Sequence, residues 1–104
     1  LLDPIMTTWD ADWSGSFASA LSDMRTDPRL PPLATDAELR GLRPPTLVMA
    51  GDRDICFPGR AVIDRVRRLV PGVQTELLID CKHCPPTTRD FRAWLAERLT
   101  RFVL

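Results

Sequence analysis

The chain has one histidine, His83. It also has an aspartate-rich turn, Gly51 to Asp54, that could supply a carboxylate partner for the imidazole. A neutral imidazole works as a general base near pH 7 only when a partner holds the right tautomer. A carboxylate on the far ring nitrogen does this, and it stabilises the imidazolium that forms. Asp54 is placed to be that carboxylate, and Asp52 is the rival. We therefore expect an acid–histidine pair that can carry proton-transfer chemistry.

Simpler interpretations of the same residues remain open. Asp52 lies nearer the end of the preceding apolar run and could instead accept hydrogen bonds from nearby backbone amides. Asp54 could equally be a solvated turn residue, because Gly-Asp-Arg-Asp is ordinary turn chemistry, and His83 could be a plain loop residue.

The second half of the chain predicts alternating strands and helices. Residues 46–50 form an apolar run of strand length between proline and glycine, which is typical of a strand buried on both faces. Residues 73–79 form the second expected strand. Between them, after Pro58 and Gly59, apolar residues recur with helical spacing at Val62, Ile63, Val66, Leu69 and Val70.

Strands linked by a helix of matching length pair in parallel, and sites in such units form at the carboxyl ends of the strands. Asp54 and His83 both lie just past those ends, 29 residues apart. A last amphipathic helix should follow a cap at Thr87 or Thr88, with an apolar face of Phe91, Trp94, Leu95, Leu99, Phe102 and Val103. The predicted fold class is α/β.

The first part of the chain shows weaker patterns. Ser14 or Ser16 could cap a helix that runs to Met24, and Trp9 and Trp13, four residues apart, are expected to cover a core. Thr35 and Glu38 have the spacing of a capping box, which predicts a short helix ended at Gly41 and the following prolines.

The cysteines allow other chemistry. Cys81, Cys84 and Cys56 together with His83 make a conceivable zinc set, although Cys84 directly follows His83, which strains simultaneous ligation. The spacing of Cys81 and Cys84 also occurs in redox motifs, but a proline pair follows here instead of a helix. A cysteine nucleophile at Cys56 or Cys81 would lack an identifiable oxyanion donor.

The stretch PTLVMAGDRD, residues 45–54, resembles the seventh strand and acid turn of the α/β-hydrolase fold family, in which Gly-x-x-Asp supplies the acid. The turn at VPGV, residues 70–73, the strand leading to His83 and the final amphipathic helix resemble that family's last elements in order. By this resemblance Asp54 is the acid and His83 the catalytic histidine. The similarity covers residues 35–104, and residues 1–34 would be a helical or irregular remnant of a cap or connection.

Two departures from the family pattern matter. Lys82 stands where the family usually has glycine, and no Gly-x-Ser-x-Gly nucleophile elbow exists in the chain. The resemblance therefore implies the C-terminal portion of a hydrolase for an ester, thioester or related bond, incomplete by itself and needing no cofactor. The alternative is a non-catalytic interaction module that uses the open edge of its sheet.

The composition limits which classes of partner the chain can bind. Fourteen basic and fourteen acidic residues cancel, so the chain has no electrostatic footprint for nucleic acid or acidic membranes. No apolar run approaches the ~18 residues of a membrane span. An odd count of three cysteines favours a reducing, cytoplasmic setting. Two parallel strands are unstable alone, so we expect pairing with another copy or with a missing N-terminal part.

Overall fold

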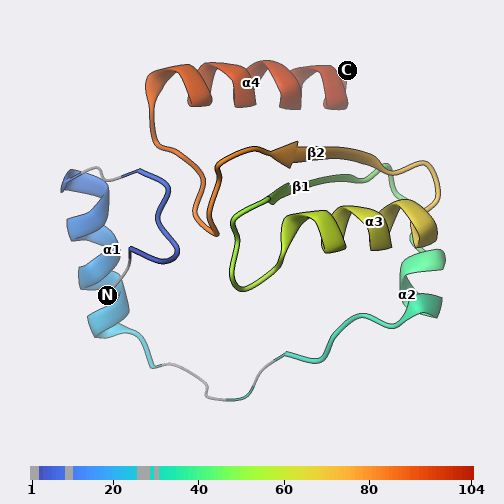
Figure 1. The fold of residues 1–104 in the computed structure, drawn as a ribbon, viewed down its shortest axis with the longest axis horizontal. Helices are drawn as coiled ribbons and strands as arrows, with labels where there is room; N and C mark the ends of the chain where they lie inside the picture. The colour runs from blue at the N-terminus through green and yellow to red at the C-terminus, as the bar shows by residue number, and fades with distance from the viewer. Residues whose placement is uncertain (1–2, 9–10, 26–28, 30) are drawn as a thin grey trace.

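The computed structural model describes residues 3–8, 11–25, 29 and 31–104, and for residues 11–14 it describes the backbone alone. The elements in chain order are α1 (Ala11–Asp23), α2 (Asp36–Arg40), β1 (Leu47–Gly51), α3 (Gly59–Leu69), β2 (Gln74–Leu78) and α4 (Arg89–Val103). Figure 1 shows α3 and α4 on opposite sides of the sheet formed by β1 and β2. This layered arrangement confirms the predicted α/β class.

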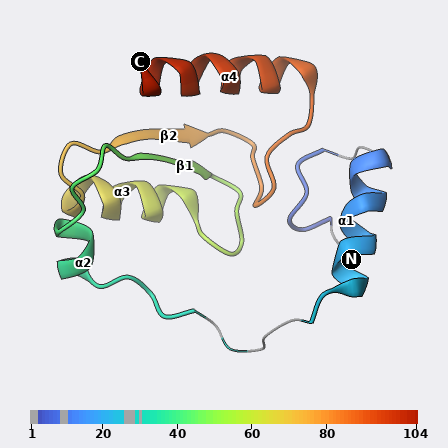
Figure 2. The same cartoon turned by 180° about the vertical axis from the view of Figure 1, so that it is seen from behind.

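The two strands pair in parallel, as the sequence predicts. The register runs from Leu47 opposite Gln74 to Gly51 opposite Leu78. Because the last residues of the two strands are partners, the loops that follow them leave the sheet at the same edge. The acid turn and the histidine loop therefore start side by side, as both views of the ribbon show (Figures 1 and 2).

Helix α3 packs on one face of the sheet through its predicted apolar side. Ile63, Leu69 and the following Val70 are buried, with 4–5% of their surface exposed. The helix starts unusually close to β1, because a Cβ atom on Gly59 would overlap the carbonyl oxygen of Gly51. Glycine at residue 59 lets the first turn of α3 touch the strand end, and this fixes where the acid turn must fit.

Burial of β1 on both faces is not observed. Leu47 to Ala50 are each only half-buried. The sheet in the described part of the chain has two strands, so each strand keeps one free edge. The second strand is also shorter than predicted, because Ile79 lies in the turn after β2 and is 65% exposed.

The α4 helix begins at the predicted cap but does not bury the predicted face. The Thr88 side chain accepts a hydrogen bond from the Phe91 N–H. Leu99 and Val103 are 43% and 76% exposed, whereas Arg98 is 7% exposed. The aromatic residues at its start, Phe91 and Trp94, are half-buried, with ring centroids 5.6 Å apart.

Arg98 turns inward because β2 presents polar side chains to α4. Its Nε donates to Glu76 Oε1 at 2.6 Å, and Nη2 donates to Gln74 Oε1 at 3.0 Å. A carboxylate at a packed face needs a charged partner, and arginine supplies a planar set of donors. Apolar periodicity marks the helix, but the polar face of β2 decides how it docks.

The N-terminal helices are simpler. In α2 the capping box of Thr35 and Glu38 is present, and Gly41 caps the C-terminus. The α1 helix begins at Ala11, so neither Ser14 nor Ser16 caps it. Serine and glycine cost a helix interior only about 0.5–1 kcal/mol each, which lets the helix run through them. The expectation that Trp9 and Trp13 cover a core falls outside the described side chains.

Helix α1 stands apart from the sheet, as Figure 1 shows; Leu21 in this helix is 41% exposed, and Met24 just after it is 61% exposed. No helix in the described ranges is long and apolar enough to cross a membrane. The division of the chain at residues 34 and 35 stays a prediction.

Candidate active site at the carboxyl ends of the strands

The turn after β1 fixes the carboxylate of Asp54. One oxygen, Oδ1, accepts hydrogen bonds from the backbone N–H groups of Cys56 at 2.7 Å and Phe57 at 3.0 Å. These donors lie just before α3, so the short segment between β1 and α3 holds the acid in place. The Asp54 side chain is 8% exposed, so most of its surface is shielded from solvent.

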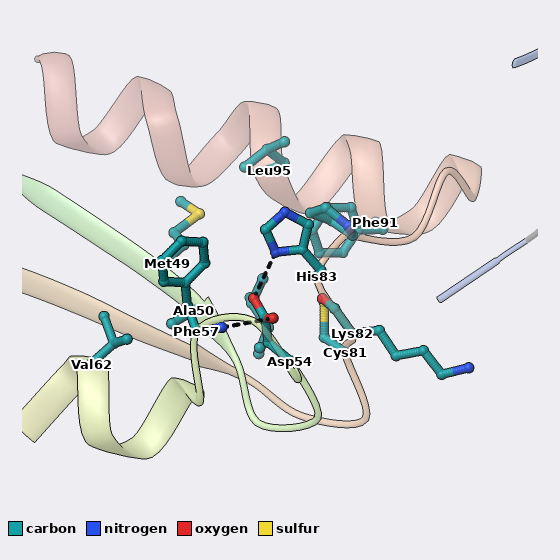
Figure 3. A pocket seen from close by; sticks show the side chains of 13 residues that line it. Met49, Ala50, Asp54, Phe57, Val62, Cys81, Lys82, His83, Phe91 and Leu95 are labelled. Atoms are coloured by element: carbon teal, nitrogen blue, oxygen red, sulfur yellow. Dashed lines mark hydrogen bonds and ion pairs between the residues drawn. The ribbon is translucent and has the colours of Figure 1, made fainter. Parts of the chain in front are cut away.

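The second oxygen of Asp54 meets the histidine. Asp54 Oδ2 lies 3.0 Å from His83 Nδ1 (Figure 3). An ionised carboxylate can only accept a hydrogen bond, so Nδ1 donates in this pair, and in the neutral imidazole Nε2 then keeps its lone pair. The imidazole is 38% exposed, which leaves Nε2 accessible to a reacting group. The structure thus brings together the two residues that the sequence pairs.

The environment keeps Asp54 ionised. Burial raises the pKa of its carboxyl group, but hydrogen bonds from the Phe57 N–H, from His83 and from the Cys56 N–H outweigh burial. The net result is a pKa below the ordinary value of 3.8. At neutral pH the group is therefore a fixed negative charge facing one side of the imidazole.

Asp52 does different work. Its Oδ1 accepts the backbone N–H of Cys81 at 3.3 Å, and its own N–H donates to the Leu78 carbonyl at 3.0 Å. The next residue, Arg53, donates its N–H to the Cys81 carbonyl at 3.0 Å. Asp52 therefore joins the acid turn to the histidine loop and, unlike Asp54, makes no contact with the imidazole among the hydrogen bonds of the described residues.

A segment near the N-terminus holds the histidine loop from the other side, and the sequence analysis missed it. Met6 forms a parallel bridge with Cys84, and its side chain is 2% exposed. The Thr7 hydroxyl bonds to the backbone of Lys82 and Cys84. Beyond the histidine loop, Thr8 Oγ1 accepts the Thr87 N–H at 2.8 Å. The only sequence signal is the short run Met6 to Thr8, and nothing in its spacing points to residue 83.

Lys82 is the residue that departs from the family pattern. Its side chain reaches away from the imidazole, and Nζ donates to the Asp3 carbonyl at 2.8 Å. Figure 3 shows the lysine and histidine side chains pointing in different directions from the same loop. The loop accommodates this bulky residue because the N-terminal segment binds the charged amino group of Lys82 through the Asp3 carbonyl.

None of the three cysteines forms a disulfide, and in the described structure Cys81 and Cys84 do not join Cys56 and His83 in a common ligand cluster. Cys81 is buried, with Sγ 3.4 Å from the Lys82 carbonyl oxygen. Burial raises the pKa of the Cys81 and Cys84 thiols, so both are protonated at neutral pH. Among the described residues, the group that could hold a metal is Asp54, Cys56 and His83, whose ligand atoms lie within 4.8 Å of one another.

A cavity of about 430 Å³ opens beside the pair. Apolar side chains dominate its wall. Phe57 lies against the imidazole, with ring centroids 5.7 Å apart. Other apolar residues in the wall, drawn in Figure 3, come from β1, α3 and α4: Met49, Ala50, Val62, Phe91 and Leu95. An uncharged group next to His83 would therefore sit in an apolar environment.

No protein-family model matches this chain, and no curated protein is similar to it in sequence. Among solved structures, the crystal structure of naproxen esterase (carboxylesterase NP) from Bacillus subtilis superimposes with a TM-score of 0.81 at 23% sequence identity. The match covers 99% of this chain and 39% of the esterase chain. The likeness shows the fold: two parallel strands and their helices form part of an α/β-hydrolase fold.

Proposed function

We propose that this chain supplies the acid and the histidine of an α/β-hydrolase that cleaves an ester, a thioester or a related bond. The observation that carries the proposal is the 3.0 Å contact between Asp54 Oδ2 and His83 Nδ1 at the carboxyl ends of two parallel strands. The esterase likeness supports a hydrolase, because the same elements occur in an enzyme of that name. The apolar cavity wall supports an uncharged substrate group.

In this proposal His83 is the general base and Asp54 its orienting partner. Nε2 takes the proton from a serine hydroxyl or a water as that oxygen attacks the carbonyl carbon of the substrate. The imidazolium that results is stabilised by the carboxylate of Asp54 and then gives its proton to the leaving oxygen or sulfur. Asp54 stays ionised throughout, and the mechanism requires no metal or organic cofactor.

The nucleophile must come from outside this chain, since no Gly-x-Ser-x-Gly elbow occurs in it. The chain spans 39% of the esterase that it resembles, which leaves room for a nucleophile and an oxyanion hole in a larger protein. We propose that the chain pairs with such a part, or with another copy of itself. Three unpaired cysteines support a reducing, cytoplasmic setting for it.

Two experiments test this function. The isolated chain, assayed with an activated ester such as p-nitrophenyl acetate, should give background hydrolysis alone, equal for wild type and His83→Ala. Genuine turnover that His83→Ala abolishes would overturn the claim of incompleteness.

The reading frame upstream of Leu1 should encode an elbow serine. In that longer protein, His83→Ala should lower kcat at least about a thousandfold, as loss of a triad histidine does. The matched control is Asp52→Asn, which should cost less than Asp54→Asn. A start codon at Leu1, or equal losses for the two aspartates, would contradict the proposal.

A metal site is a second candidate function, and the cluster of Asp54, Cys56 and His83 favours it. Carboxylate, thiolate and imidazole suit zinc, but tetrahedral bonds of 2.0–2.3 Å require ligand atoms about 3.4 Å apart, so the Asp54–His83 contact would have to open. Elemental analysis of the chain after dialysis against zinc decides between a metal site and an acid–histidine pair. Retained zinc that Cys56→Ser removes and Cys84→Ser leaves would establish the metal site.

A further inference from the structure

One hydroxyl group joins the residues on both sides of His83. Thr7 Oγ1 accepts the backbone N–H of Lys82 at 2.9 Å and donates to the carbonyl oxygen of Cys84 at 2.7 Å. Thr7 Oγ1 also lies 3.7 Å from Cys81 Sγ, but its single proton is committed to the shorter bond. The side chain of Thr7 thus spans the backbone of the histidine.

The hydroxyl itself is held on a fixed backbone. The Thr7 N–H donates to the Cys84 carbonyl at 3.3 Å, and the Cys84 N–H donates to the Ile5 carbonyl at 2.7 Å. Met6, between these residues, is 2% exposed and anchors the segment. Threonine is also stiff about χ1 because it is branched at Cβ, so its hydroxyl has few positions to explore.

The opposite side of the loop is held by the acid turn. Cys81 receives the N–H of Arg53 on its carbonyl and donates its own N–H to Asp52. The backbone is therefore fixed before the histidine by the acid turn and around it by Thr7. The imidazole of His83 is left to project between these clamps toward Asp54.

We propose that Thr7 is a positioning residue for His83, which holds the imidazole in register with Asp54; this rests on the proposed function. The pair needs such help because His83 is 38% exposed, and a partly solvated contact contributes too little to fix a loop by itself. Without the Thr7 hydroxyl the N–H of Lys82 and the carbonyl of Cys84 lose a partner, and the loop relaxes away from Asp54.

Because the chain has a single histidine, nitrogen-edited NMR spectra of the imidazole report on His83 alone. The experiment uses the complete chain with EDTA present, and compares wild type with Thr7→Val, which keeps the shape but removes the hydroxyl, and Thr7→Ser, which restores it. Wild type and Thr7→Ser should show the Nδ1–H tautomer with a downfield, hydrogen-bonded proton. Thr7→Val should lose that proton signal and show mixed tautomers.

Two threonines serve as matched controls. Thr8 bonds to Thr87, outside the span of His83, and Thr100 bonds to the Ala96 carbonyl within α4. Thr8→Val and Thr100→Val should keep the wild-type ring spectrum. A wild-type spectrum in folded Thr7→Val, or the same loss in the controls, would overturn the positioning role.

Asp54→Ala, which removes the hydrogen-bond acceptor, separates this proposal from the proposed function. If Asp54→Ala leaves the ring spectrum unchanged, the acid–histidine pair itself fails, and the proposed function and the Thr7 role are both refuted. If Asp54→Ala changes the spectrum and Thr7→Val does not, the positioning role alone fails.

Should Thr7→Val not fold, hydrogen exchange of the wild-type chain decides. The Lys82 amide should exchange at least about fivefold more slowly than in the unfolded chain, the factor expected for one net hydrogen bond, and exchange as fast as in the unfolded chain would refute the clamp.

Discussion

Gly51 packs closely against the backbone carbonyl group of Cys81. A Cβ atom at residue 51 would overlap the Cys81 carbonyl oxygen and stand 2.9 Å from the carbonyl oxygen of Lys82. The last residue of β1 therefore touches the backbone of the histidine loop, and this contact sets the distance between the acid turn and His83.

Gly51→Ala is expected to destabilise the chain and displace the loop. The obstructing atoms are backbone, which cannot rotate away, and overpacking of this kind typically costs about 1–3 kcal/mol. Urea unfolding followed by circular dichroism measures the change. The control is Gly15→Ala in α1, where a Cβ meets nothing within 4 Å and helix propensity predicts a gain of about 0.5–1 kcal/mol. An undiminished stability in Gly51→Ala would contradict the close contact.

Arg98→Met should lower the free energy of unfolding by about 1–3 kcal/mol, the range for losing hydrogen bonds to a charged group. The substitution keeps the aliphatic stem but leaves Glu76, which is 33% exposed, without its partner at 2.6 Å. Arg101→Met is the matched control. It removes a more exposed pair with Glu97 at 4.0 Å on the same helix, and should change stability by less than about 0.5 kcal/mol. Equal effects of the two substitutions would argue against docking of α4 through Arg98.

The depressed pKa of Asp54 predicts a pH-dependent contribution to stability. A carboxyl group whose pKa is lower in the folded chain than in the unfolded chain stabilises the fold fully above its ordinary pKa of 3.8. That contribution is lost as the pH falls from there through the folded-state pKa. The stability difference between wild type and Asp54→Asn should therefore shrink on acidification, in urea titrations from pH 7 down to pH 3. Thr100→Val should keep a constant offset from wild type, and a constant offset for Asp54→Asn would show that its pKa is not lowered.

Thiol reactivity should separate the three cysteines. Cys56 is exposed, whereas Cys81 is buried and Cys84 half-buried, and burial raises the pKa of the latter two. With a chromogenic disulfide reagent near pH 7.5, we expect one fast thiol and two slow ones that become fast in denaturant. Cys56→Ser should remove the fast phase and Cys84→Ser should leave it. A fast phase that survives in Cys56→Ser would place another thiol at the surface.

The chain in isolation should self-associate at micromolar concentration. Both strands of its sheet have a free edge in the described structure, and exposed apolar residues include Ile55, Phe57, Ile79, Val103 and Leu104. Sedimentation equilibrium measures the mass. A stable monomer would count against the need for a partner. If the chain forms stable dimers and every longer version of the protein lacks hydrolase activity, the non-catalytic interaction module is favoured instead.

The sequence determined the elements and their order by itself. Apolar periodicity located α3, proline and glycine bounded β1, and Thr35 and Thr88 capped their helices, because these are local effects that a few neighbouring residues decide. The parallel pairing followed from strands and crossover of matching length. The expectation that Asp54 and His83 approach each other also followed, since parallel strands release their loops at one edge.

Only the tertiary structure shows which residues hold Asp54 and His83 in place. Thr7 is 75 residues from Lys82, and no local pattern reports a contact made at such a separation. The inward turn of Arg98 likewise depended on the polar face of β2, where Gln74 and Glu76 accept its hydrogen bonds. These outcomes arise from packing between distant segments, where one hydroxyl or carboxylate is satisfied by a partner that the sequence order does not reveal.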